Sequence, residues 1–106
     1  MARTPSYDDL LAAGAALRTR LAELGTSVDA LDELVHDIRL WQRRSAWVVV
    51  ARNPRQAADF RAETGPFQRP MGVWLPTPGW QRRLDNSLGE WLRALDRMRY
   101  LSLAER

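Results

Sequence analysis

The sequence lacks cysteine and lysine altogether and contains a single histidine among its 106 residues. Without cysteine there is no disulfide framework, no thiolate metal site and no cysteine nucleophile. His36 has two acids nearby, Asp32 and Glu33, but zinc sites normally draw on several histidine or cysteine ligands. We therefore predict no metal site and interpret His36 as a helix-surface residue that pairs with an acid.

Long apolar segments and catalytic motifs are also missing. The longest uninterrupted apolar run, residues 46–51, is far shorter than the roughly 20 residues that span a bilayer. No apolar stretch typical of a secretory signal follows the first residues, so we expect a cytoplasmic protein that contacts no membrane. No serine has a recognisable base partner, and there is no glycine-rich phosphate loop. The sequence thus predicts no enzyme, no catalytic residue and no cofactor.

The residues that are present have the composition of a folded domain, with 45% hydrophobic and 27% charged residues. These fractions are ordinary for globular proteins and argue against wholesale disorder. A chain of this length predicts one domain, residues 1–106, with one modest core. All 16 basic residues are arginines. Codon usage in a GC-rich genome is the simpler explanation, and selection for bidentate binding of phosphate or carboxylate is the alternative.

Apolar residues recur at helical spacing in the first half of the chain. Ser6 has the position of an N-cap before a first helix that stops at Gly25, and Ser27 caps a second helix. Gly14 lies on the inner face of the first helix. Because glycine lowers helix propensity, its presence there favours close approach of another helix.

The end of the second helix is ambiguous. Residues 46–51 are rich in β-branched valine and are compatible with a buried strand that pairs with residues 72–75. An isolated two-stranded pair is only marginally stable, however. We therefore predict that the second helix continues into the valines, and an α+β fold with this small pair is the minority interpretation.

Two proline patterns predict the remaining helices. Asn53 followed by Pro54 is typical of a cap and a first helical residue, and a short helix then runs to residues 65–66. Thr77 and Pro78 repeat the pattern before a last helix. A second capping pattern within this helix favours a break near Asn86. The whole predicts a mainly α fold: a compact bundle of about four helices, with a Pro-, Gly- and aromatic-rich loop before the last helix.

Positive charge is concentrated in the middle of the chain. Residues 1–37 carry three arginines and seven acids, residues 38–84 carry nine arginines and two acids, and residues 85–106 carry four of each. In the first two helices the acids come early and the arginines late, an order that the helix dipole favours. Much of the charge layout is therefore explained by helix stability.

Four arginines depart from this order. Arg52 and Arg55 flank one predicted helix start, and Arg82 and Arg83 follow the other. The dipole disfavours positive charge there unless an anion binds the free N–H groups and the guanidinium groups together. The alternative is that these arginines extend into solvent or pair with nearby acids.

Aromatic residues share this basic middle region. We expect Trp41, Trp80 and Trp91 in the core and leave Trp47 undecided. Phe67 and Trp74 lie in the predicted loop and are the aromatics expected to be free for stacking or for an interface. Arginine together with accessible aromatics favours contact with phosphate groups and stacking of bases.

We therefore predict a non-enzymatic, nucleic-acid-associated protein that belongs to a larger assembly. The predicted anion- or nucleic-acid-binding residues are Arg43, Arg44, Arg52, Arg55, Arg69, Arg82 and Arg83. The alternative is a protein-interaction adaptor that docks on an acidic protein or forms a homo-oligomer. In that case the acidic first third and the basic middle pair between copies, and tryptophan and arginine act as interface anchors.

Overall fold

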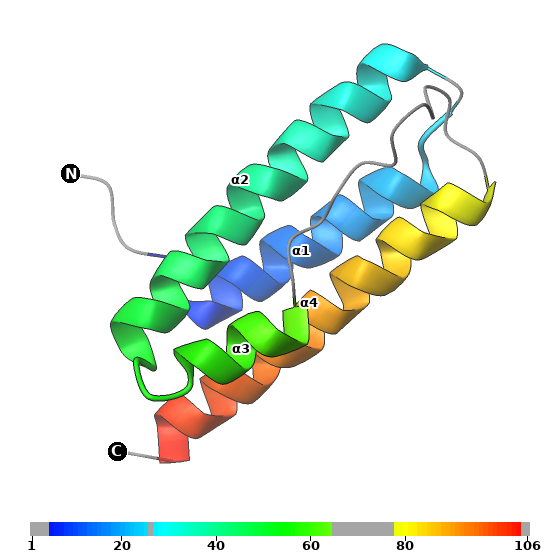
Figure 1. Ribbon diagram of the computed structural model, residues 1–106. Coiled ribbons are helices and arrows are strands. Elements are labelled where there is room, and N and C mark those ends of the chain that lie inside the picture. Colours follow the sequence, from blue (N-terminus) through cyan, green and yellow to red (C-terminus); the bar gives the residue numbers. More distant parts are fainter. Residues whose placement is uncertain (1–4, 26, 65–77, 105–106) are drawn as a thin grey trace.

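Figure 1 shows the computed structural model, which describes residues 5–25, 27–64 and 78–104. These ranges form four helices and no strand: α1 Tyr7–Ala22, α2 Val28–Arg52, α3 Ala57–Thr64 and α4 Pro78–Ala104. The prediction of a mainly α bundle of about four helices is therefore confirmed over the described ranges. The predicted loop at residues 65–76 lies outside them.

The three long helices lie side by side, and α1 runs antiparallel to both α2 and α4 (Figure 1). α1 contacts each of these two helices more extensively than they contact each other. The short α3 packs against α2 and α4, at the end of the bundle where α2 finishes. The arrangement leaves the outer side of α2 and the groove between α1 and α2 uncovered by the other described helices.

The first two helices begin where the capping residues predict. The Ser6 hydroxyl accepts a hydrogen bond from the Asp9 N–H at 3.1 Å, and the Asp9 carboxylate accepts one from the Ser6 N–H at 3.2 Å. The Ser27 hydroxyl accepts from the Ala30 N–H at 3.2 Å at the start of α2. α1 ends before Gly25, because Glu23 is already its C-cap. Local hydrogen bonding therefore determines both starts.

Residues 46–51 are helical, so the minority interpretation of a strand there is wrong. α2 continues through them to Arg52, and its proposed strand partner at residues 72–75 lies outside the described residues. Val48 and Val49 are fully buried on the face of α2 that also buries Ile38. Their burial against the bundle outweighs the strand preference of β-branched residues.

Asn53 is not the N-cap of α3, in contrast to the sequence prediction. It is the C-cap of α2, with its N–H donating to the Val49 carbonyl at 2.7 Å, and α3 begins only at Ala57. The fully buried Asn53 amide accepts a hydrogen bond from the Tyr7 hydroxyl and donates one to the Met98 carbonyl at 3.3 Å. The side chain thus links α1, α2 and α4 instead of capping α3.

α4 is one continuous helix, so the predicted break near Asn86 is also wrong. Leu84, Leu88 and Leu95 are buried along a single face, and α4 contacts α1 extensively. A break between them would change the direction of this face and interrupt its packing against α1. Continuous burial therefore overrides the local capping pattern.

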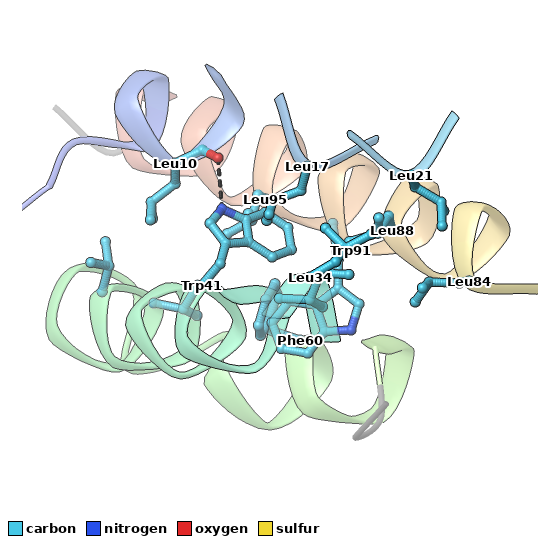
Figure 2. Packing of buried hydrophobic residues seen from close by; sticks show 14 of the residues in the cluster. Leu10, Leu17, Leu21, Leu34, Trp41, Phe60, Leu84, Leu88, Trp91 and Leu95 are labelled. Atoms are coloured by element: carbon cyan, nitrogen blue, oxygen red, sulfur yellow. Dashed lines mark hydrogen bonds between the residues drawn. The ribbon is translucent and has the colours of Figure 1, made fainter. Parts of the chain in front are cut away.

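The core is built around tryptophans (Figure 2). Trp41 and Trp91 are each 5% exposed, which confirms their predicted core positions, and their ring centroids lie 5.9 Å apart. Phe60 of α3 packs edge-to-face on Trp91 at 5.2 Å. Trp47 is 60% exposed and therefore does not belong to the core. The side chain of Trp80 lies outside what the structure describes.

Gly14 has the close neighbour that the sequence predicts. A Cβ atom at this position would lie 2.6 Å from Trp41 Cζ2 and 2.5 Å from Leu92 Cδ2. Figure 2 shows the Trp41 indole extending from α2 to α1, where its Nε1–H donates to the Leu10 carbonyl at 2.9 Å. Glycine is therefore required for the contact between α1 and its two neighbours.

Candidate functional site

The two arginine pairs beside the predicted helix starts, Arg52 with Arg55 and Arg82 with Arg83, lie at opposite ends of the bundle. Arg82 and Arg83 follow Gln81, whose amide contacts the Leu24 carbonyl at 3.5 Å beyond the end of α1. Arg52 and Arg55 lie on either side of Asn53, which contacts the Met98 carbonyl near the end of α4. From Gln81 to Met98 the axis of α4 spans about 25 Å at 1.5 Å per residue. The two pairs therefore cannot bind one small anion together.

The structure also changes the dipole argument. Arg52 is the last residue of α2, the end at which the dipole favours a cation, so the premise of an unfavourable position is wrong for it. Arg55 lies in a turn two positions before the first residue of α3. Arg82 and Arg83 lie in the second turn of α4, where the dipole has largely faded. Residues Phe67, Arg69 and Trp74 lie outside the described residues.

Other arginines join helices of the bundle through ion pairs. The Arg18 guanidinium binds Asp85 with two contacts of 2.8 and 2.9 Å, and this hydrogen bonding lowers the pKa of Asp85. Arg20 binds Asp37 at 2.7 Å and joins α1 to α2. In contrast, the exposed predicted arginines form no ion pair within the described ranges: Arg43, Arg44, Arg52, Arg55, Arg82 and Arg83.

The outer face of α2 carries large apolar side chains in solvent. Leu40, Trp47 and Val50 are 39%, 60% and 44% exposed. Together with His36 and Arg43 they alternate at steps of four and three residues, which places all five on one side of a helix. We call these five residues the α2 outer face. Its opposite side is the buried one.

A groove of ≈ 660 Å³ lies between α1 and α2 and adjoins this face. Its lining includes small side chains from α1 and both apolar and charged side chains from α2. The alanines are Ala13 and Ala16, Leu40 belongs to the outer face, and Asp37 and Arg44 are charged. Alanine on one wall lets an incoming helix approach closely. The groove and the α2 outer face therefore form one continuous surface through Leu40.

Charge is divided along the exposed side of α2. Its first half exposes Asp29, Asp32 and Glu33, and the half-buried Asp37 follows. From Arg39 onward, α2 exposes only basic charges: Arg39, Arg43, Arg44 and Arg52. The sequence showed this order but gave it a purely local explanation through the helix dipole. In the folded protein it also gives one surface two oppositely charged halves.

Metal and membrane features are not found in the described ranges. No three histidine, aspartate or glutamate side chains gather there into a possible metal site. No helix within these ranges combines the length and the apolar character needed to cross a bilayer. No protein-family model matches this sequence, and no match is found among curated proteins or solved structures.

Trp47 is the candidate site residue that sequence reasoning missed. The helical spacing along α2 indicates that Trp47 is exposed, because residues 41, 45 and 48 are buried on the side facing away from position 47. The alternative interpretation of residues 46–51 as a strand prevented this prediction, because a strand places position 47 differently. Once α2 is continuous, position 47 lies on the outer side.

Proposed function

We propose that this protein is a non-enzymatic interaction module that docks another protein on the α1–α2 side of its bundle. The observation that carries the proposal is the 60% exposed Trp47, which has Leu40 and Val50 on the same face. Tryptophan and arginine are the residues most enriched among the energetic anchors of protein interfaces. Arg43 and Arg44, one turn before Trp47, supply the polar rim of such an anchor.

The energetics favour covering this side chain. A tryptophan contributes roughly 150–250 Å² of surface, so a partner that covers the exposed part stabilises the complex by about 2–4 kcal/mol. The neighbouring groove adds apolar surface through Leu40. A protein partner with its own apolar helix face therefore fits better than a small ligand.

A photoreactive phenylalanine derivative in place of Trp47 tests the proposal in cells that express the full chain. We expect a protein adduct at this position and none from the same residue in place of Asn86, an exposed position of α4. Failure to form an adduct at position 47, or equal adducts at both positions, would contradict the proposal.

Nucleic-acid binding is a second candidate, and one observation favours it. Arg43 and Arg44 lie one helical turn from the exposed Trp47 and form no ion pair within the described ranges. Single-stranded nucleic acids bind proteins by base stacking on aromatics combined with phosphate contacts from cations. The separated arginine pairs at the two ends of the bundle give less support.

A salt titration tests this second candidate. The binding of a fluorescent single-stranded oligonucleotide is measured by anisotropy at increasing salt. R43A/R44A is expected to reduce the slope of log K against log salt by about 1.4, since each phosphate contact contributes about 0.7. R82A/R83A is the matched control, and a loss confined to that variant would move the site to α4. The absence of binding at low salt would rule out this candidate.

A further inference from the structure

We propose that the partner of the α2 outer face is a second copy of this chain, with the two α2 helices packed antiparallel about a twofold axis at Leu40. The inference rests on the proposed function and names its partner. Three features carry it: the position of Leu40, the order of charges on α2 and the composition of the other exposed helix faces.

Leu40 lies at the midpoint of α2, which runs from Val28 to Arg52. A twofold axis at this residue therefore overlaps the two helices along their full length. It also places the exposed apolar side chains Leu40, Trp47 and Val50 of both copies in one interface. Twofold interfaces of this kind are self-complementary, so each contact occurs twice.

The order of charges selects the antiparallel arrangement. With the axis at Leu40, Arg44 of one copy lies beside Asp37 of the other, because the two residues are four and three positions from the axis. Both residues line the groove side of α2, and the symmetry keeps that side of each copy together. Two Arg44–Asp37 ion pairs result. A parallel arrangement would instead place basic half against basic half and acidic half against acidic half.

Within the described residues, the other exposed helix faces lack this combination of large apolar side chains and complementary charges. The outer side of α4 exposes Arg82, Asn86 and Arg93, and its large exposed apolar residues, Tyr100 and Leu103, lie only near its end. The groove wall from α1 presents alanines, which accept a neighbouring helix rather than anchor one. Among the described side chains of the three long helices, those of α2 alone combine anchors and complementary charges on the same side.

The size of the contact sets the expected strength. A strip about 37 Å long and about 12 Å wide amounts to about 450 Å² on each copy, or about 900 Å² in total. Stable interfaces begin near 1,200 Å², so a micromolar, concentration-dependent dimer is expected.

Analytical ultracentrifugation of the full chain from about 1 μM to about 1 mM tests the dimer. We expect a monomer–dimer equilibrium, weakened about tenfold or more by W47A, by R44D and by D37R. R93D, at an exposed arginine of α4, is the matched control and is expected to dimerise like the original chain.

A mixture of R44D and D37R tests most directly whether Arg44 and Asp37 pair across the twofold axis. Each variant alone faces two like-charge contacts across the axis, whereas the mixed pair again joins acid to arginine at both contacts. We therefore expect each variant alone to dimerise more weakly than the original chain, and the mixture to regain the original strength. Because D37R also removes the partner of Arg20 within one chain, thermal unfolding of each variant checks that it is folded.

Two results would overturn the inference. One is a chain that stays monomeric at every concentration, and the other is a dimer that the mixture of R44D and D37R fails to restore. A monomeric chain whose position 47 still crosslinks to a different protein would overturn self-association and leave the proposed function standing. A nuclease-sensitive adduct at position 47 would overturn both proposals in favour of nucleic acid.

Discussion

The indole ring of Trp41 lies against Gly14 so closely that a Cβ atom on Gly14 would be 2.6 Å from Trp41 Cζ2. The same indole donates its Nε1–H to the carbonyl of Leu10, one turn earlier in α1 (Figure 2). A single side chain therefore packs on the backbone of α1 and bonds to it. This contact determines how closely α1 and α2 approach.

Replacing Gly14 by alanine is expected to destabilise the protein. Alanine favours helix by about 1 kcal/mol over glycine, but the clash forces the Trp41 ring and the Leu92 side chain to shift. We expect a net loss of about 1–3 kcal/mol in the free energy of unfolding, measured by urea denaturation.

Gly89→Ala is the matched control for that substitution. Its Cβ atom would meet only the flexible Arg18 guanidinium, at 3.7 Å, so the gain in helix propensity remains. We expect it to stabilise the protein by roughly 0.5–1 kcal/mol. Destabilisation by both variants to the same extent would contradict the specific role of Gly14.

The buried Tyr7 predicts a loss of stability at alkaline pH. Burial raises the pKa of Tyr7 to about 12, although the positive charge of Arg52 acts in the opposite direction. Above pH 10 the unfolded chain releases this proton while the folded chain keeps it. Stability is therefore fully present below about pH 10 and falls by about 1.4 kcal/mol per pH unit up to about pH 12.

Urea denaturation between pH 9 and pH 11.5 measures this dependence. Y7F is expected to be less stable at pH 9, because the Asn53 amide loses the Tyr7 hydroxyl, but to show a flatter decline. Y100F removes a 69% exposed tyrosine and is expected to keep the original decline. An unchanged decline in Y7F would contradict the assignment to Tyr7.

The Arg18–Asp85 pair is expected to contribute little despite its two short contacts. Both side chains are 42% exposed, so solvent screens the interaction and the coupling energy is about 0.5 kcal/mol. Hydrogen bonding to Arg18 lowers the pKa of Asp85, so this contribution is present above about pH 4 and is lost as the pH falls through the lowered pKa. A double-mutant cycle of R18A and D85A at low and high salt measures it. Coupling above 2 kcal/mol that salt leaves unchanged would contradict this expectation.

Phe60 is expected to hold α3 on the bundle. It is the one buried side chain among those that the structure describes in α3, and it packs edge-to-face on Trp91. A helix of eight residues is not stable by itself. F60A is expected to lower stability by about 3–5 kcal/mol and to remove hydrogen-exchange protection from α3 before α1, α2 and α4.

F60L is the conservative control for Phe60. It retains much of the apolar contact with Trp91, so we expect α3 to keep most of its protection. Uniform loss of protection in all four helices of F60A would instead show that α3 is not a separately released element.

Local features of the sequence predicted the helices well, and non-local contacts explain the failures. The hydroxyls of Ser6 and Ser27 act within three residues, so their capping patterns hold in the structure. Asn53 has an equally good capping pattern, but its amide bonds to Tyr7 and Met98, far away in the sequence. A pattern of neighbouring residues contains no information about which distant groups the Asn53 side chain will bind.

The candidate site divides in the same way. The sequence by itself determined the helical identity of most of the chain and the acid-to-arginine order along α2, because these depend on spacing along one helix. Gly14 indicated a close approach to α1, but only the tertiary contacts with Trp41 and Leu92 made glycine a requirement there. Only the tertiary structure decided that Arg52 and Arg82 lie at opposite ends of the bundle, and that Trp47 extends into solvent while Trp41 is buried. The antiparallel packing of α1 between α2 and α4 determines where these arginines lie and which tryptophan is buried, because it determines which side of each helix is covered.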